Sequence, residues 1–214
     1  MITVYVFGNA PGPVRNITRD LRALWALEEV GFPYRLHRLD FAGGELQGRD
    51  YTRVNPFGKV PSIDDDGFTL FESAAIVLYV AEKAGRLLPT TPEERTLAEQ
   101  WTFAAVNTVE PPIVELFTID ALFADQPWAK GRRPLVVEHV KQRLATLDAE
   151  FVKRPYILGG EFSAPDILMA TVLRMVQQPD LLETAPNVAA YLARCESRPA
   201  WTKVLAEHQQ RLAA

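Results

Sequence analysis

The sequence predicts two domains of different class, an α/β domain followed by an all-α helical domain. Two observations predict it. Up to about residue 84, short β-branched and aromatic runs alternate with helical patterns bounded by glycine, whereas only helical patterns follow the proline-containing segment 87–92. We therefore expect a first domain at residues 1–86, a linker at 87–92 and a second domain at 93–214. The 214 residues are 48% apolar, enough for a real core.

The first elements expected are a strand, a helix and a strand. Residues 2–7 are β-branched and aromatic, and a loop rich in glycine and proline follows at 8–13. A helix comes next, with Thr18 as a candidate N-cap and Gly31 as its C-terminal stop. Residues 34–39 read as a second strand. Because a strand, a helix and a strand in succession form a right-handed crossover, the two strands should be parallel.

A β-hairpin and a helix should complete the first domain. Residues 40–56 are rich in glycine and charge and are compatible with a short helix. Pro61 begins a short strand, because proline is confined to the starts and edges of strands, and residues 65–67 form the turn into 68–70. A helix then runs from Ser73 to Ala84. The order βαβ, then ββα, predicts a four-stranded sheet with helices on its faces.

The second domain begins with a capping box. Thr91 is followed by proline at the first helical position and Glu94 at the third, so a long helix should run to about Phe123 with a kink at Pro111-Pro112. Further helices are expected at about 134–153, 163–177, 187–196 and 199–212.

Composition and charge exclude several functions. The 23 basic and 27 acidic residues give a net charge of −4, so we expect no nucleic-acid surface and no polybasic membrane patch. The three histidines and one cysteine are scattered, so no metal site is expected. Cys195 should be a buried core thiol. No run approaches membrane-spanning length and no charged leader precedes residues 2–7, so we expect a cytoplasmic protein.

A candidate binding site surrounds Val60 and Pro61. We expect the peptide bond between them to be cis, so that the chain turns sharply and presents the N–H and C=O of Val60 to an extended ligand, which could pair with them as an added strand. Ser73 opens an apolar helix, and the free N–H groups of a helix N-terminus favour a carboxylate. Together these features predict a site for a small acidic peptide.

The first domain contains two motifs, Gly58-Lys59-Val60-Pro61 and, after ten intervening residues, Glu72-Ser73. Together they resemble the glutathione-binding half of the cytosolic glutathione transferase family, in its bacterial, theta-like or related classes. A second capping box, Ser163-Ala164-Pro165-Asp166, also looks like one that this family carries, and it should stabilise the fold. The resemblance covers nearly the whole chain. It implies that the first domain is thioredoxin-like and that the protein is a homodimer.

Glutathione offers groups that match these residues. We expect Ser73 to bind the γ-glutamyl carboxylate, Glu72 the neighbouring ammonium or amide, Val60 beside Pro61 the cysteinyl backbone, and Lys59 the glycine carboxylate.

The chemistry requires a donor that stabilises the glutathione thiolate, and family members use tyrosine, serine or cysteine near the first helix. Residues 8–22 contain no serine or cysteine, so Thr18 is the remaining hydroxyl, although it could simply cap the helix. The side chains of Asn9, Arg15 and Asn16 are alternative donors in the same loop.

The second domain should supply the pocket for a small apolar electrophile, from Trp101, Phe103 and Asn107, although aromatics at this spacing also suit a core. The sequence therefore predicts a glutathione transferase, with glutathione as co-substrate and a role in detoxification. Glutathione-dependent isomerisation, dehalogenation or peroxide reduction would use the same thiolate, and a non-catalytic binding or scaffold protein could keep the same fold.

Overall fold

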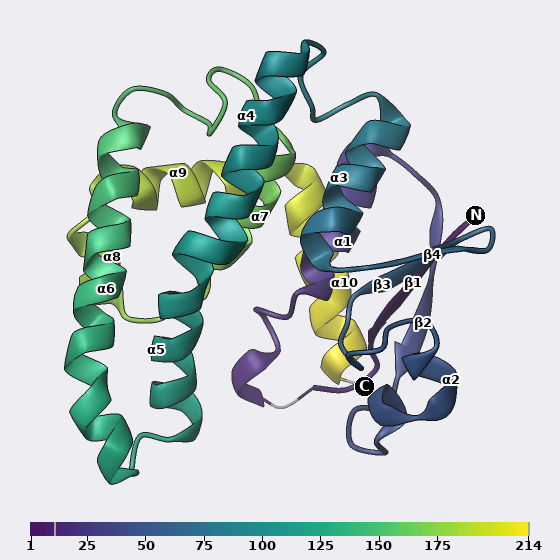
Figure 1. Cartoon of the computed structure of the whole chain (residues 1–214), viewed down its shortest axis with the longest axis horizontal. Helices are drawn as coiled ribbons and strands as arrows, with labels where there is room; N and C mark the ends of the chain where they lie inside the picture. Colours follow the sequence, from purple (N-terminus) through teal and green to yellow (C-terminus); the bar gives the residue numbers. More distant parts are fainter. Residues whose placement is uncertain (11, 214) are drawn as a thin grey trace. The chain divides into compact units, whose positions relative to one another are not determined.

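The computed structural model describes residues 1–10 and 12–213 (Figure 1). Pro11, which belongs to the loop expected at 8–13, lies outside the described residues. The chain forms two compact units, Met1–Leu88 together with Arg198–Ala214, and Pro89–Ser197. The division after Leu88 falls within the expected linker. The C-terminal segment, which we assigned to the second domain, belongs to the first unit.

The first unit contains a four-stranded mixed sheet in the order β2-β1-β3-β4. Its strands are β1 (Ile2–Phe7), β2 (Tyr34–Leu39), β3 (Ser62–Asp65) and β4 (Phe68–Phe71). β1 runs parallel to β2, as the order of elements predicted, and it pairs antiparallel with β3. Asp66 and Gly67, with φ of 52° and 96°, form the two-residue turn between β3 and β4.

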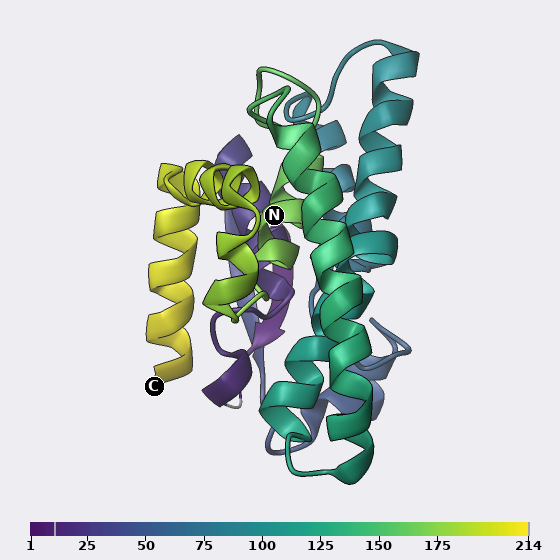
Figure 2. The same cartoon turned by 90° about the vertical axis from the view of Figure 1, so that its left-hand side faces the viewer.

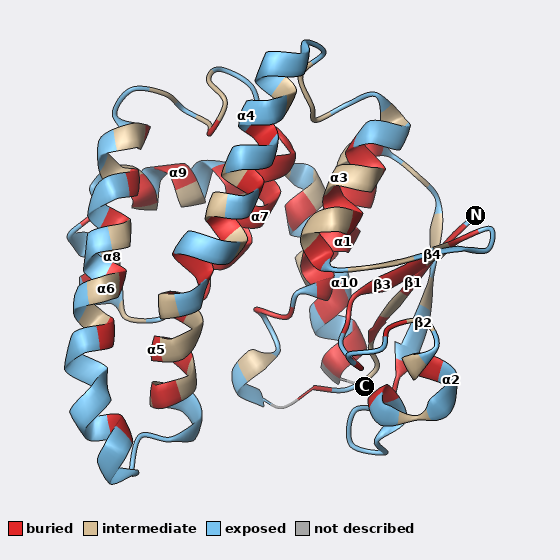
Figure 3. Cartoon of the chain, in the orientation of Figure 1, coloured by how far each residue is buried: buried red, intermediate tan, exposed pale blue. Residues whose placement is uncertain are grey.

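Helices α1 (Asp20–Val30) and α3 (Ser73–Ala84) pack together against one face of this sheet (Figure 1). Figure 3 shows that β1 and α1 are largely buried, and Val4 and Val6 of β1 are fully buried. Tyr5 points to the opposite face, where its ring lies 5.5 Å from that of Tyr51 in α2 (Arg49–Thr52). Two single turns complete the connections, η1 (Gly12–Val14) and η2 (Glu45–Gln47).

The start of α1 corrects one expectation. The helix begins at Asp20, the N-cap position is Arg19, and no side chain caps the helix. Thr18 is therefore not the N-cap, because its hydroxyl is within hydrogen-bonding distance of His208 instead. The C-terminal end matches the expectation, since Gly31 takes the left-handed conformation with φ of 78°.

The last helix, α10 (Pro199–Ala213), packs against α1, which explains why it belongs to the first unit. The rings of Trp25 and Trp201 lie 4.6 Å apart, and Arg198 makes two 2.7 Å contacts with the carboxylate of Glu29. Figures 1 and 2 show that α10 (yellow) ends beside the loop that follows β1 (purple).

The second unit is all-helical, as expected. Its helices are α4 (Pro92–Phe103), α5 (Glu110–Leu122), α6 (Pro127–Phe151), α7 (Ala164–Leu173), α8 (Pro179–Glu183) and α9 (Pro186–Glu196), and a π-helical segment η3 (Ala104–Val109) joins α4 to α5. The helix does not kink at Pro111-Pro112 as expected. Instead, the π-helical segment η3 interrupts it just before the two prolines. The two prolines then occupy the start of α5, where a missing N–H costs little.

Two further boundaries differ from expectation, and one helix was not expected. Helix α6 begins at Pro127 and carries Pro134 inside it, so Pro134 does not mark its start. Helix α7 ends at Leu173, four residues before the expected end, and the five-residue α8 was not expected.

The capping box of α7 is confirmed. One carboxylate oxygen of Asp166 accepts from the N–H and the hydroxyl of Ser163, at 2.9 and 2.6 Å. The other accepts from the N–H of Ile157 and the hydroxyl of Tyr191, both at 2.9 Å. Every residue of α7 is buried, and so is Cys195 of α9. The buried start of this helix therefore has hydrogen-bond partners, as its sequence predicted.

Candidate glutathione site

The β3–β4 hairpin brings the two halves of the predicted site together. Ser62 pairs with Phe71 at the open end of the hairpin, so Val60-Pro61 enters β3 beside the point where Glu72-Ser73 leaves β4. The Val60–Pro61 peptide bond is cis, as expected. The hairpin register therefore explains how two short motifs that are separate in the sequence come to lie at one end of the sheet.

The loop before Val60 is held by hydrogen bonds to the carbonyl of Lys59. This carbonyl accepts from the Tyr51 hydroxyl at 2.5 Å and from the Asn55 side-chain amide at 2.7 Å. The Val60 side chain packs in a small apolar cluster with Leu39, Leu46 and Tyr51. In the part of the chain that the structure describes, no hydrogen-bond partner reaches the backbone N–H or C=O of Val60. A fixed backbone with a free donor and acceptor can pair with an extended ligand.

Gly58 is required by the same loop. Its φ is +58°, and a Cβ at this position would lie 2.5 Å from the Leu46 carbonyl oxygen and 2.6 Å from the Gln47 side-chain nitrogen. A larger residue would force the loop away from η2.

Glu72 and Ser73 form the start of α3, but neither acts as an ordinary side-chain cap. Glu72 occupies the N-cap position with φ of 70°, an uncommon value for a residue with a side chain, and makes no capping hydrogen bond. Ser73 is buried, and its hydroxyl accepts from Arg22 of α1 at 3.1 Å. Arg22 is itself only 2% exposed. A guanidinium and the N-terminus of α3 therefore meet at Ser73, and both favour an anion.

The loop after β1 lies at the same end of the sheet. Tyr5 pairs with Ser62, so β1 ends next to the residues that precede β3. Asn9 connects this loop to the residues after β2. Its amide nitrogen donates to Asp40 at 2.7 Å, and its oxygen accepts from the N–H of Phe41 at 2.8 Å. Hydrogen bonds from the Gly43 N–H and from Asn9 lower the pKa of the Asp40 carboxyl.

The other candidate donors in this loop also have partners within the unit. Arg15 donates to the Ala10 carbonyl at 3.3 Å, and the Asn16 side chain accepts from Gln209 at 3.1 Å. Thr18 is buried, and its hydroxyl oxygen lies 3.2 Å from Nε2 of His208.

His208 connects Thr18 to a buried ion pair. Nε2 of His208 also contacts the Arg15 carbonyl, and Nδ1 lies 2.6 Å from Nη2 of Arg211. The same Arg211 nitrogen donates to Asp20 at 2.9 Å. Burial lowers the pKa of the Arg211 guanidinium, although the charge of Asp20 opposes that shift. This buried network links the end of the chain to the loop between β1 and α1.

The residues expected to bind the electrophile belong to the second unit. Phe103 and Asn107 are both exposed, at the end of α4 and in η3. Trp101 lies under the guanidinium of Arg154, 5.0 Å from its centre. Because residues two apart point to opposite sides of a helix, Trp101 does not share a face with Phe103. Of the three residues expected to bind the electrophile, only Phe103 and Asn107 are exposed, and Trp101 lies on another face of the helix.

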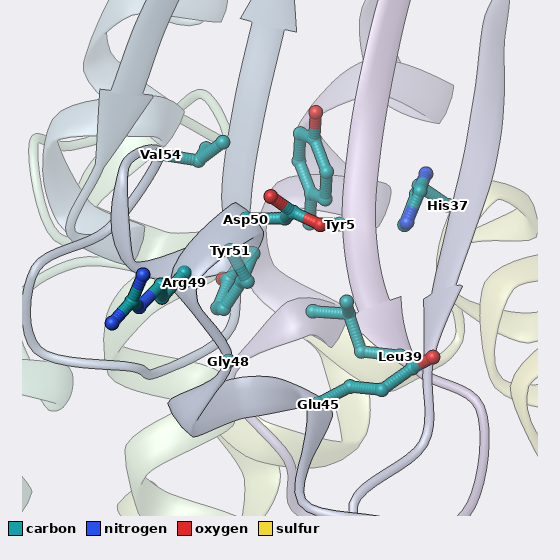
Figure 4. Close-up of a pocket in the computed structure, with 9 residues that line it drawn as sticks. All are labelled: Tyr5, His37, Leu39, Glu45, Gly48, Arg49, Asp50, Tyr51 and Val54. Atoms are coloured by element: carbon teal, nitrogen blue, oxygen red, sulfur yellow. The ribbon is translucent and has the colours of Figure 1, made fainter.

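A cavity of about 340 Å³ lies between the sheet and α2, and none of the predicted site residues lines it. Figure 4 shows Tyr5 and His37 on neighbouring strands, with Asp50 of α2 pointing toward Tyr5. The rings of Tyr5 and His37 are 4.8 Å apart. Burial raises the pKa of Tyr51, whose hydroxyl is committed to Lys59 and Ser62.

Among the described residues, no three histidine, cysteine or acidic side chains gather closely enough to hold a metal ion. No helix of the described chain is both long and apolar enough to span a bilayer.

Models of two protein domains match the chain, the N-terminal domain of glutathione S-transferases at residues 14–82 and the C-terminal domain at 124–199. Glutathione S-transferase F9 from Arabidopsis thaliana is 30% identical over 198 residues, which cover 87% of this chain and 92% of the relative. The chain therefore belongs to the glutathione S-transferase family.

Solved structures of this family have the same fold. A glutathione transferase family member from Pseudomonas fluorescens, with two glutathione bound, has a TM-score of 0.85 and 25% identity, covering 95% of this chain and 92% of that one. A glutathione transferase from Burkholderia graminis, with two glutathione molecules bound per subunit, has a TM-score of 0.85 and 27% identity, covering 95% and 87%. The resemblance and the fold class inferred from the sequence are thus confirmed.

Several residues of this transferase-family site were missed from the sequence. Tyr51 and Asn55 hold the Lys59 carbonyl, and Arg22 contacts Ser73. His208 contacts Arg15 in the loop after β1, and Arg211 contacts Phe7 at the end of β1. Asn55 carried a local signal, because asparagine before proline favours a turn. Tyr51 lies only eight residues before Lys59 but carried no such signal, and Arg22, His208 and Arg211 act across the fold, where no local pattern marks them.

Proposed function

We propose that this protein is a glutathione transferase, which joins the sulfur of glutathione to an apolar electrophile. The observation that carries the proposal is the backbone of Val60, which has no hydrogen-bond partner among the described residues and lies beside the N-terminus of α3. The structures with glutathione bound support the same ligand class.

Each part of glutathione has a partner in this proposal. The cysteinyl N–H and C=O pair with Val60 beside Pro61, as an added strand would. The γ-glutamyl carboxylate binds the Ser73 hydroxyl and the first N–H groups of α3, and Arg22 adds positive charge there. Glu72 is exposed and binds the γ-glutamyl ammonium, and Lys59 is exposed and binds the glycine carboxylate.

Thr18 is the proposed donor to the glutathione sulfur. Asn9 donates its amide nitrogen to Asp40, which favours Thr18 over Asn9, whereas Arg15 and Asn16 stay alternative donors. A hydroxyl that donates to the sulfur stabilises the thiolate and lowers the thiol pKa from its reference of about 8.5. The thiol proton leaves to solvent. The thiolate then forms a bond to the electrophilic carbon, and the leaving group departs with its electron pair.

The electrophile, the assembly and the location are further parts of the proposal. Phe103 and Asn107 offer an exposed apolar and polar surface for a small electrophile. A homodimer is supported by the exposed rings of Phe57 and Phe68, which are 66% and 50% accessible in the single chain. Sedimentation at micromolar concentration should give twice the 24.0 kDa chain mass, and a species at the chain mass would contradict the dimer. A cytoplasmic location stays a prediction.

Calorimetry and an activity panel test the function. Glutathione should bind, and the complex should conjugate at least one of a set of aryl halides, alkyl halides and activated alkenes. Turnover of peroxides or haloacids alone would point to the peroxidase or dehalogenase alternative. Binding without any turnover would favour a non-catalytic binding protein, and absence of binding would contradict the proposal altogether.

A further inference from the structure

The hydrogen bonds around His208 determine which of its ring nitrogens carries the hydrogen. Nδ1 faces Nη2 of Arg211 at 2.6 Å, and a guanidinium can only donate, so Nδ1 must accept. Nε2 faces the Arg15 carbonyl, which can only accept, so Nε2 must donate. The Arg211 contact requires a neutral imidazole with its hydrogen on Nε2, and the Arg15 contact requires a hydrogen on the same nitrogen.

This tautomer fixes the role of the Thr18 hydroxyl. The Thr18 oxygen lies 3.2 Å from the same Nε2 and can only accept from it, because a protonated ring nitrogen has no lone pair to offer. The hydrogen of the Thr18 hydroxyl is therefore not directed at His208. It is left for an acceptor elsewhere.

Arg211 is well placed to hold this arrangement. Nη2 donates to Asp20 at 2.9 Å, and Nε donates to the Phe7 carbonyl at 3.1 Å. Arg211 thus contacts the last residue of β1 and the first residue of α1, on both sides of the loop that contains Thr18. The charged or titratable groups that act on Arg211 are Asp20, Arg38, Tyr34 and Glu207.

We propose that His208 and Arg211 are positioning residues for thiol activation. Arg211 holds His208 in the Nε2–H tautomer, and that tautomer leaves the hydroxyl hydrogen of Thr18 for the sulfur of bound glutathione. This inference rests on the proposed function, since it requires glutathione to bind with its sulfur at Thr18. The end of the chain is then part of the catalytic arrangement without touching the substrate.

The test compares three variants of α10 by the thiolate absorbance of bound glutathione against pH. His208→Leu removes both ring nitrogens, so the bound thiol should titrate about one pH unit higher, which is about tenfold less thiolate near neutral pH. His208→Gln keeps a donor and an acceptor and should restore much of the shift. Gln209→Ala is the control, because it removes a different bond from α10 to the same loop, at Asn16. It should leave the titration unchanged.

Calorimetry on the same proteins separates the possible failures. If the wild-type protein binds no glutathione, the proposed function fails and this inference fails with it. If glutathione binds equally to wild type and His208→Leu, and the two titrations coincide, only the inference is overturned.

Because His208 is fully buried, the leucine variant could fail to fold, and a measurement on the wild-type protein then decides. The nitrogen chemical shifts of the His208 ring should show Nε2 protonated and Nδ1 unprotonated. An imidazolium, or a hydrogen on Nδ1, would overturn the inference.

Discussion

Nη1 of Arg22 lies 3.1 Å from the hydroxyl oxygen of Ser73, and both side chains are buried. This contact joins α1 to the first residue of α3. Because Arg22 donates to the oxygen, the Ser73 hydroxyl hydrogen remains free to donate to an anion. The contact therefore gives Ser73 a fixed position and a fixed direction, and places a positive charge behind it.

Ser73→Ala should weaken glutathione binding about tenfold or more, because it removes a hydrogen bond to a carboxylate worth roughly 1.5–3 kcal/mol. The measurement is calorimetry with glutathione. Ala74→Ser, one position later in the same helix, is the matched control and should bind as wild type does. Unchanged affinity in Ser73→Ala would remove Ser73 from the site.

Arg22→Met should also weaken glutathione binding, since it removes both the charge near the ligand carboxylate and the group that orients Ser73. The loss should shrink when Ser73→Ala is already present, because residues in contact are coupled. A double-mutant cycle of glutathione affinities measures this coupling. Strictly additive losses would show that Arg22 acts on the ligand independently of Ser73.

Thr18→Val keeps the shape of the side chain and removes the hydroxyl. Bound glutathione should then titrate at higher pH and kcat should fall, while affinity for glutathione stays close to wild type. Thr18→Ser retains the hydroxyl and should restore the lower thiol pKa. Coincident titrations of wild type and Thr18→Val would move the search to Asn9, Arg15, Asn16 or backbone N–H groups of this loop.

Asp65 should make stability depend on pH. Hydrogen bonds from Lys83 and from the Tyr79 hydroxyl, the latter at 2.7 Å, lower the pKa of its carboxyl. A carboxyl whose pKa is lower in the folded state stabilises the fold above its unfolded pKa of about 3.9, and that contribution is lost as the pH falls through the folded value.

Urea unfolding near neutral pH and in acid measures this dependence. Asp65→Asn should make it shallower, whereas Asp66→Asn should change it little, because Asp66 is 81% exposed in its pair with the N-terminus. Equal pH dependence in wild type and Asp65→Asn would contradict the role of Asp65.

Most of the fold follows from local signals in the sequence. Gly31 and Gly85 end helices in the left-handed conformation, and the residues at Thr91 and Ser163 begin helices with the expected caps. The misplaced boundaries have local causes as well. Pro134 resembled a helix start but lies within α6, and α8 has five residues, too few for a helical pattern to be seen.

The sequence predicted only those parts of the candidate site whose residues lie close together along the chain. Val60-Pro61 and Glu72-Ser73 are short motifs on either side of one hairpin, so their spacing was informative. Arg22 meets Ser73 across 51 residues, and His208 meets Thr18 across 190. Such contacts depend on how α1, α3 and α10 pack, which a single sequence does not specify.

The most direct test of the account is the hydrogen exchange rate of the Val60 amide with and without glutathione. This amide has no acceptor within the described chain, so it should exchange readily in the free protein. Glutathione paired with the Val60 backbone should slow its exchange markedly, while the amide of Ile63, already buried in β3, should change little. Exchange at Val60 that is unchanged by saturating glutathione would contradict the proposed site.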